Sequence, residues 1–329
     1  MKQLRIILGT LLPLAAAGLA VWVRTYRPDM RPAPVISVAR TPAQIARGRY
    51  LAEHVTGCLG CHSHRDWSRF GGPVAGPLGT GGDCLSKEYG LPGTVCTPNL
   101  TPDRATGLGG WSDGEVMRAV REGVDREGNA LFPFMPYVEY RSLSDEDARA
   151  IVAYLRTLPA VAHAVPDTEV GFPASFFVRM VPTPLGRPVP PPDRADRLAY
   201  GRYLTIVAGC RFCHTPTDSH GRPIPGRDFA GGQEFRGPWG TQRAPNLTPH
   251  RTGLAATGRD EFVGRFKAFE GADLAVPAEQ RGRNTVMPWL EYAGMTREDL
   301  GAIYDYLRTL PPIANRVEVY PAPLQTAAR

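Results

Sequence analysis

Two short segments of this sequence combine cysteine and histidine at the same spacing. Cys58, Cys61 and His62 lie in the segment GCLGCH, and the segment GCRFCH at residues 209–214 repeats the arrangement. A Cys-x-x-Cys pair alone is compatible with a zinc site, a redox-active dithiol or a disulfide. A histidine directly after the second cysteine favours a fourth chemistry, the covalent attachment of a c-type haem.

The geometry of a helical turn explains this pattern. Residues three apart lie on the same face of a helix, so both thiols of a motif reach the two vinyl groups of one porphyrin. The following histidine then binds the iron as its proximal ligand. Zinc would need a second pair of ligands, and a thioredoxin-like dithiol needs a βαβ pattern; neither accompanies the motifs. The sequence predicts two covalently bound haem c groups, held by Cys58, Cys61, Cys210 and Cys213, with His62 and His214 as iron ligands.

An internal repeat surrounds the two motifs. The blocks PNLTP, MP-aromatic-x-EY and YLRTLP each occur twice and in the same order, together with the cysteine motifs and a GRYL block before them. The repeat is too long, and has too few copies, for a solenoid. We therefore predict two domains at residues 45–160 and 198–313, a Pro-rich connector at 161–197, an N-terminal segment at 1–31 and a tail at 314–329.

Each copy has the sequence pattern of helices joined by loops. Ser144 and Thr296 precede amphipathic stretches and have an aspartate three residues later, which is typical of a helix N-terminus. Ser112 and Thr257, each with an acidic residue three positions on, predict the caps of a middle helix in each copy. Because the chain has no alternating strand pattern of useful length, we expect an all-α fold.

The N-terminus has the features of a targeting segment. Lys2 and Arg5 precede an uncharged 18-residue stretch at residues 6–23. This stretch is near the minimum length for spanning a bilayer, and it is longer than the usual apolar core of a signal peptide. We expect an uncleaved apolar helix that anchors an exported protein to the membrane, with a cleaved signal peptide as the alternative.

Composition limits the classes of partner. A hydrophobic content of 43% excludes wholesale disorder, and 36 glycines with 33 prolines indicate compact domains rich in loops. The net charge is +6, but residues 1–31 contribute +4 of it. Because the body has no basic stripe with interleaved aromatic residues, we do not expect nucleic-acid binding.

The repeated blocks resemble the class I cytochrome c family. Gly48 and Tyr50 in RGRYL, and Gly201 and Tyr203 in YGRYL, are similar to its N-terminal helix, where the glycine permits close crossing with the C-terminal helix. The segments GGWSDGEVMRAVREGV and MPWLEYAGMTREDLGAIYDYLRTLPP resemble cytochrome subunits of periplasmic, membrane-bound dehydrogenases, which usually carry three haem domains. The resemblance implies two tandem class I cytochrome c-like helical domains in the periplasm.

Methionines are the expected sixth ligands of the iron. Met135 in MPYVEY and Met287 in MPWLEY occupy matching contexts in the two copies. Met117 and Met295 have no methionine at the equivalent position, which is typical of core residues. We therefore expect His/Met ligation of both haems.

Two further pairs of residues complete the candidate sites. Cys84 and Cys96 lie in an insertion of the first copy, where an oxidising compartment favours a disulfide over two free thiols. Asn99 and Asn246 lie in the PNLTP loops, and they are also good turn residues. The resemblance implies that this loop runs beside the haem, which would bring both asparagines near the haem propionates.

These features predict an electron-transfer protein and not an enzyme. A haem with protein ligands on both faces leaves no open position for a substrate. We expect electrons to pass between a dehydrogenase catalytic subunit and a respiratory-chain acceptor such as a terminal oxidase or another cytochrome. The alternative is a dihaem cytochrome c peroxidase, which needs one haem with an open face. The matched methionines favour the electron carrier.

Overall fold

A computed structural model of the chain describes residues 15–219, 221–237, 240–271 and 284–321. Its regular structure is mainly helical, and equivalent helices recur in the two copies of the repeat. The first copy and the connector contain α2 (Pro42–Tyr50), a π-helical turn (Leu51–Val55), α3 (Cys58–Cys61), β1 (Cys84–Leu85), a 3-10 turn (Lys87–Tyr89), β2 (Gly93–Cys96), a 3-10 turn (Leu108–Gly110), α4 (Asp113–Glu122), α5 (Tyr137–Tyr140), α6 (Asp145–Leu155), β3 (Glu169–Val170) and α7 (Ala174–Arg179). The second copy contains α8 (Arg197–Val207), α9 (Cys210–His214), β4 (Glu234–Gly237), β5 (Gly240–Arg243), α10 (Arg259–Lys267), α11 (Trp289–Ala293) and α12 (Arg297–Leu307).

Each copy is built on a close crossing of its first and last long helices. In the first copy α2 crosses α6, and a Cβ atom on Gly48 would lie only 1.8 Å from the carbonyl oxygen of Ala150. In the second copy α8 crosses α12, and a Cβ atom on Gly201 would lie 2.0 Å from the carbonyl oxygen of Ala302. Both crossings therefore need glycine, as the resemblance to the cytochrome family implies.

Three of the four predicted helix caps are present. The side chains of Ser144, Thr296 and Ser112 accept hydrogen bonds from backbone N–H groups three residues on, and Ser112 forms a full capping box. The fourth prediction is wrong, because α10 has Gly258 as its N-cap residue. The Thr257 hydroxyl instead accepts a hydrogen bond from the guanidinium group of Arg265. The backbone carbonyl of Thr257 accepts a hydrogen bond from the hydroxyl of Tyr304 in α12.

The fold is mainly helical but also contains short strands, so the expectation that the chain has no strands is wrong. The strands β1, β2 and β3 form a small antiparallel sheet, and β4 pairs with β5 in an antiparallel hairpin. These strands have two to four residues each, which is too short for an alternating pattern to be recognised. Through β3, which pairs with β2, the connector lies against the first copy.

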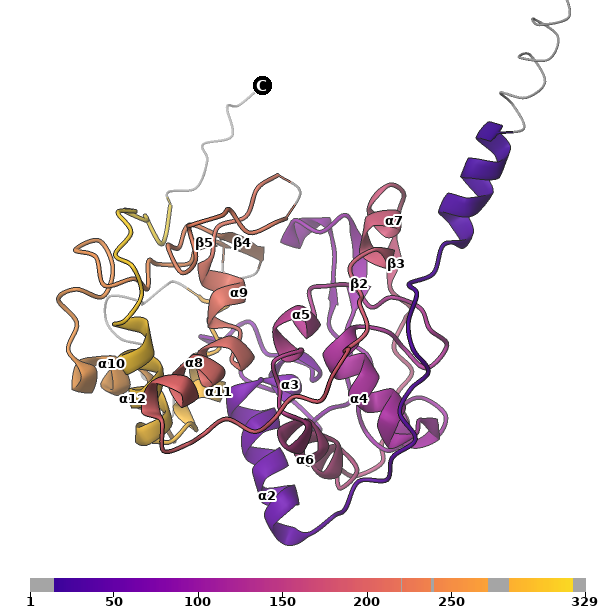
Figure 1. Ribbon diagram of the computed structural model, residues 1–329, viewed down its shortest axis with the longest axis horizontal. Helices are drawn as coiled ribbons and strands as arrows, with labels where there is room; N and C mark the ends of the chain where they lie inside the picture. Colours follow the sequence, from indigo (N-terminus) through magenta and orange to yellow (C-terminus); the bar gives the residue numbers. More distant parts are fainter. Residues whose placement is uncertain (1–14, 220, 238–239, 272–283, 322–329) are drawn as a thin grey trace, which may run out of the picture.

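The helices of the two copies lie beside each other (Figure 1) and contribute to one hydrophobic cluster. Leu51 and Ile151 from the first copy, and Leu204 and Leu300 from the second, are among its fully buried members. The division into two domains at the stated boundaries stays a prediction.

The N-terminal segment is described in part. Residues 15–25 are helical, while residues 1–14 lie outside the described part of the chain, as do residues 272–283 and most of the tail (322–329). Among the described helices, none is both long enough and apolar enough to span a membrane. The predicted anchor at residues 6–23 therefore stays a prediction.

Candidate functional site

The two cysteine motifs lie on short helical segments that begin in the same way. Gly57 and Gly209 precede them with φ of 63° and 70°, a left-handed conformation that glycine adopts without strain. This turn redirects the chain from α2 and its π-helical extension into α3 in the first copy, and from α8 into α9 in the second. Each motif is thereby placed directly after the helix that carries the close crossing.

The histidines of the two motifs have equivalent hydrogen-bond partners, a proline carbonyl oxygen in each copy. The Nδ1 atom of His62 lies 2.9 Å from the carbonyl oxygen of Pro98, and that of His214 lies 2.8 Å from the carbonyl oxygen of Pro245. A carbonyl oxygen only accepts, so Nδ1 carries the proton and Nε2 is left as the atom that binds a metal. The sequence analysis missed this role of the prolines, although both belong to the repeated PNLTP block.

Burial keeps both imidazoles neutral. The side chains of His62 and His214 are 8% and 6% exposed. Burial lowers the pKa of His62, and it lowers the pKa of His214 to about 4, while the hydrogen bonds to the proline carbonyls oppose this shift. A neutral imidazole with a free Nε2 is the form that binds iron.

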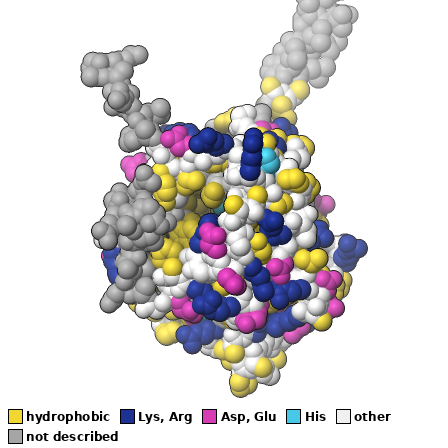
Figure 2. All heavy atoms as spheres, turned by 90° about the vertical axis from the view of Figure 1, so that its left-hand side faces the viewer, with side chains coloured by type: hydrophobic (Ala, Val, Ile, Leu, Met, Phe, Trp, Pro, Cys, Tyr) yellow, Lys and Arg dark blue, Asp and Glu magenta, His cyan; other side chains and the backbone are white. Residues whose placement is uncertain are grey.

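A cavity of about 380 Å³ in the second copy brings the predicted ligand residues together. Cys210, Cys213, His214 and Met287 all line it, with aliphatic and aromatic side chains around them. Its size is that of a small-molecule binding site, and thiols, an imidazole and a thioether are the donors that hold haem c. The residues present therefore fit this cofactor. Figure 2 shows this side of the molecule, where hydrophobic side chains gather at the surface.

The loop that carries each methionine has the same local structure in the two copies. The backbone N–H groups of Tyr137 and Trp289 donate to the carbonyl oxygens of Met135 and Met287, both at 2.8 Å. Met135 and Met287 are also both half-buried and pack against the hydrophobic cluster. The matching contexts seen in the sequence are therefore matching structures.

A tyrosine joins each methionine loop to the cysteine motif of its own copy. The hydroxyl of Tyr140 donates to the carbonyl oxygen of Thr56 at 2.6 Å, and the hydroxyl of Tyr292 donates to the carbonyl oxygen of Ala208. Thr56 and Ala208 each lie two residues before the first cysteine of a motif. These tyrosines end the repeated EY blocks, and the sequence analysis did not assign them this positioning role.

The asparagines of the PNLTP loops bind protein groups. The amide nitrogen of Asn99 donates to the carbonyl oxygen of Val161 at 2.9 Å, and that of Asn246 donates to the carbonyl oxygen of Ile313 at 2.8 Å. Both asparagines thereby hold the loop against the segment that follows the last helix of the copy. Asn246 also lines the cavity, and the contact with haem propionates stays a prediction.

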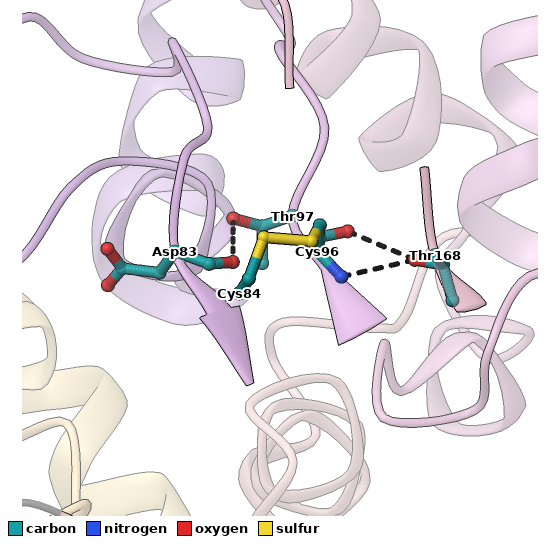
Figure 3. The surroundings of a disulfide bond; sticks show 5 residues. All are labelled: Asp83, Cys84, Cys96, Thr97 and Thr168. Atoms are coloured by element: carbon teal, nitrogen blue, oxygen red, sulfur yellow. Dashed lines mark hydrogen bonds between the residues drawn. A yellow bond between two sulfur atoms is a disulfide. The ribbon is translucent and has the colours of Figure 1, made fainter. Parts of the chain in front are cut away.

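Cys84 and Cys96 form a disulfide between β1 and β2, at directly opposed positions in the two strands (Figure 3). The backbone N–H group of Cys96 donates to the hydroxyl of Thr168 in the connector at 3.1 Å. The strand β2 leads straight into Pro98, whose carbonyl oxygen binds His62. The disulfide therefore fixes the loop that orients this histidine, and the hairpin β4–β5 precedes Pro245 in the same way without a disulfide.

Equivalent residues of the two copies exchange contacts across the interface between them. The hydroxyl of Tyr50 donates to Asp299 at 2.6 Å, and that of Tyr203 donates to Asp147 at 2.6 Å. Tyr50 and Tyr203 are equivalent in the repeat, as are the two aspartates. Asp147 is also bound by both nitrogens of an arginine fork, from Arg47 at 2.8 Å each.

A second reciprocal contact links the methionine loops to the cysteine motifs of the opposite copies. Arg211, inside the second motif, lies 3.1 Å from Glu139 of α5, and Arg65, just after the first motif, lies 3.3 Å from Glu291 of α11. Glu291 also lies against Gly60 in the first motif. Burial raises the pKa of Glu139, and the charge of Arg211 opposes this shift.

Burial also affects the thiols of the second cysteine motif. Burial raises the pKa of the Cys213 thiol to about 12, with smaller contributions from the charges of Cys210 and of Cys61 in the other copy. Within the described part of the chain, no group of three or more His, Cys, Asp or Glu side chains is arranged to hold a metal ion.

Comparison with known proteins shows similarity to cytochrome c proteins. The chain is 36% identical to the cytochrome c subunit of gluconate 2-dehydrogenase from Pantoea cypripedii over 184 residues, which are 53% of this chain and 38% of the relative. It is 29% identical to a diheme cytochrome c-type protein of Cereibacter sphaeroides over 262 residues, 78% of this chain and 83% of the relative. No protein-family profile matches the chain.

A third relative is also a subunit of a dehydrogenase. The chain is 28% identical to the cytochrome c subunit of alcohol dehydrogenase (quinone) from Gluconacetobacter polyoxogenes over 296 residues, 84% of this chain and 59% of the relative. The chain thus spans less than two thirds of the dehydrogenase subunits that it matches. Its homologues are cytochrome c subunits of dehydrogenases and a diheme cytochrome c, which confirms the resemblance seen in the sequence.

Proposed function

We propose that this chain is a dihaem c-type cytochrome that carries electrons. The observation that carries the proposal is the duplicated histidine site: a buried imidazole after two cysteines, with its Nδ1 bound to a proline carbonyl in both copies. Cys58, Cys61 and His62 would hold one haem c, and Cys210, Cys213 and His214 the other. Met135 and Met287 would supply the sixth ligands.

The residues of the chain prepare each site for a redox change with little rearrangement. When bound, haem c supplies an iron that alternates between the ferric and ferrous states. The proline carbonyls hold His62 and His214 in one tautomer. The hydrogen bonds donated by the hydroxyls of Tyr140 and Tyr292 fix each methionine loop against the cysteine motif of its copy. The mostly apolar lining of the cavity lowers the polarity around a bound haem, which favours the state with lower charge.

The interface between the copies supports electron passage along the chain. The reciprocal pairs between Arg211 and Glu139, and between Arg65 and Glu291, connect each cysteine motif to the methionine loop of the other copy. The side chains of Arg65 and Glu291 are each only 9% exposed. Such buried, paired charges hold one relative orientation, because breaking the pair leaves a buried charge without compensation.

A dehydrogenase is the proposed electron donor. The relatives are named as cytochrome c subunits of gluconate, alcohol and fructose dehydrogenases, and a respiratory-chain component is the proposed acceptor. We place the chain in the periplasm, organised as two domains at residues 45–160 and 198–313 and anchored to the inner membrane by residues 6–23. In this role the chain itself is not an enzyme.

Haem stoichiometry tests the proposal. The mature protein should contain two haems that acid-acetone does not extract, because thioether bonds are covalent. Replacing Cys58 and Cys61 by alanine should remove one haem, and replacing Cys210 and Cys213 should remove the other. A parent protein with a single haem, or with an extractable one, would contradict the duplicated site.

Spectroscopy separates the electron carrier from the peroxidase. If Met135 and Met287 bind iron, both oxidised haems are low-spin and show the weak long-wavelength band of a sulfur–iron bond. Met135→Ala should open a coordination position and confer reactivity with peroxide. Rapid turnover of peroxide by the unmutated protein would instead assign the chain to the enzyme class.

A further inference from the structure

The connector helix α7 and the residues on either side of it have large apolar side chains that no described part of the chain covers. Phe172, Phe177 and Met180 are 74%, 61% and 53% exposed, and the neighbouring Val181 is also exposed. We call these four residues the α7 patch. Water contact with so many large apolar side chains on one short segment is unfavourable, so the patch indicates a surface that is covered in the working protein.

The position of α7 indicates what covers it. Phe176 packs edge-on against Trp22 and Tyr26, with ring centroids 5.6 Å and 5.9 Å apart. Arg179 donates to the backbone carbonyl oxygens of Arg24 and Val23 at 2.8 Å and 2.7 Å, which caps the C-terminal end of the helix at residues 15–25. Figure 1 shows α7 beside that end of the helix.

That helix end coincides with the end of the uncharged stretch at residues 6–23. Trp22 and Tyr26 at this point are the residue types that gather at the interface between lipid and water. The strand β3 joins α7 to the disulfide-bonded sheet, so the α7 patch is held at a fixed place relative to the cytochrome body. A membrane that takes up the apolar stretch would therefore meet the α7 patch at its surface.

A basic cleft lies where these two elements meet β3 and the segment at residues 129–132 of the first copy. It has a volume of about 490 Å³, and Arg24, Arg27 and Arg179 line it together with Thr25 and Ser175. None of the described residues that line it is acidic. The Nε atom of Arg179 is buried and has no hydrogen-bond partner among the described residues. A cleft lined by three guanidinium groups and by no described acidic side chain suits the phosphate of an anionic lipid.

We propose that the α7 patch and this basic cleft form a second membrane contact, in which the patch enters the bilayer interface and the cleft binds the phosphate of an anionic phospholipid. The inference rests on the membrane anchoring in the proposed function. Two contacts, one from the N-terminal stretch and one from α7, would hold the cytochrome body in a single orientation on the membrane. One contact alone would leave the body free to rotate about the anchor.

A spin label tests the position of the patch. In the full haem-containing chain, Phe177→Cys would introduce the only free thiol, since the other cysteines are in thioethers or the disulfide. The labelled chain is bound to vesicles of phosphatidylethanolamine and phosphatidylglycerol, and the accessibility of the label to oxygen and to a water-soluble nickel complex gives its depth. We expect a depth of roughly 5–10 Å below the headgroup boundary. The matched control is Ile224→Cys, an exposed apolar position in the second copy, which should stay in water.

The lipid specificity is tested with Arg24→Gln combined with Arg27→Gln. The label at position 177 should lie deeper in vesicles with phosphatidylglycerol than in pure phosphatidylcholine, and the double variant should lose this difference. Added inorganic phosphate should leave the depth unchanged, because the proposed ligand is part of the bilayer. A loss of depth on adding phosphate alone would assign the cleft to a free anion and overturn the lipid assignment.

Other outcomes separate this inference from the anchor and from the proposed function. If the chain floats with the vesicles while the label at position 177 stays as aqueous as that at 224, the α7 contact is wrong and the anchor stands. If the label becomes immobile only when a dehydrogenase catalytic subunit is added, the patch binds protein and the proposal is overturned. If the chain does not float with the vesicles, both the α7 contact and the N-terminal anchor are wrong. The proposed electron-transfer function is tested separately by the haem spectrum.

Discussion

A methyl group at Gly48 should separate the two helices that position the first cysteine motif. In Gly48→Ala the new Cβ atom would lie 1.8 Å from the oxygen and 2.4 Å from the carbon of the Ala150 carbonyl group. Ordinary van der Waals contact begins at 3.4 Å. The obstructing atoms are backbone atoms inside α6, so no side-chain rotation relieves the clash. The helix α2 must therefore move away from α6 by roughly 1.5 Å, a distance that disrupts close packing.

The expected cost follows from this displacement. Overpacking a well-packed core costs about 1–3 kcal/mol and occasionally more, and a clash with rigid backbone belongs at the upper end. The better helix propensity of alanine offsets about 1 kcal/mol of it. We therefore expect Gly48→Ala to lower the free energy of unfolding by about 2 kcal/mol or more. Because α2 continues through the turn Leu51–Val55 to Cys58, the sulfur–iron band of the first haem should also weaken while that of the second is retained.

The assay is urea denaturation of the haem-containing protein, followed by far-ultraviolet circular dichroism. The chain offers a matched control in Gly264→Ala, because a Cβ atom at this exposed position of α10 meets no atom within 4 Å. This control should stabilise the protein by about 0.5–1 kcal/mol. If Gly48→Ala were as stable as Gly264→Ala, the close crossing of α2 and α6 would not be needed, and the argument from this contact would be refuted.

Three further predictions concern the second site and the loops. Met287→His should keep the second haem low-spin and lower its potential in a spectroelectrochemical titration, because imidazole favours oxidised iron more than a thioether does; an unchanged potential would exclude this methionine as a ligand. Thiol labelling of the denatured, unreduced protein should leave Cys84 and Cys96 unmodified, and reduction should destabilise the protein by about 3 kcal/mol; free labelling would contradict the disulfide. Asn246→Ala should lower the free energy of unfolding by about 2 kcal/mol, since its buried carbonyl partners lose their donor; an unchanged denaturation midpoint would show that the amide does not hold the loop.

The local chemistry of the sites was predictable because it depends on residues that are close in sequence. The spacing of Cys58, Cys61 and His62 predicts a haem motif wherever the chain goes afterwards, and the caps at Ser144 and Thr296 are local hydrogen bonds. The resemblance also implied the glycine crossing at Gly48. The prediction at Thr257 failed because α10 begins one residue later, with Gly258 as its N-cap, and the Thr257 hydroxyl accepts a hydrogen bond from Arg265 of the same helix.

The partners of the repeated residues were decided by tertiary structure. The sequence does not reveal that Tyr50 binds Asp299 of the other copy. A repeat contains an equivalent aspartate in each copy, and the local sequence is similar around both. The same holds for Arg211 and Glu139. The short strands that lead to Pro98 could not be predicted from the sequence either, because two to four residues are too few to show an alternating pattern of apolar and polar residues.

The sequence by itself determined which residues are candidates to hold haem: two cysteine–histidine motifs, their repetition and the methionines that accompany them. These features depend only on side-chain type and on spacing along the sequence, so they are recognised without knowledge of how the rest of the chain folds. Only the tertiary structure decided that the copies exchange their tyrosine, arginine and carboxylate contacts, and that α7 lies at the end of the N-terminal helix. Those contacts join residues far apart in sequence, and their free energy depends on a burial that only the folded chain provides.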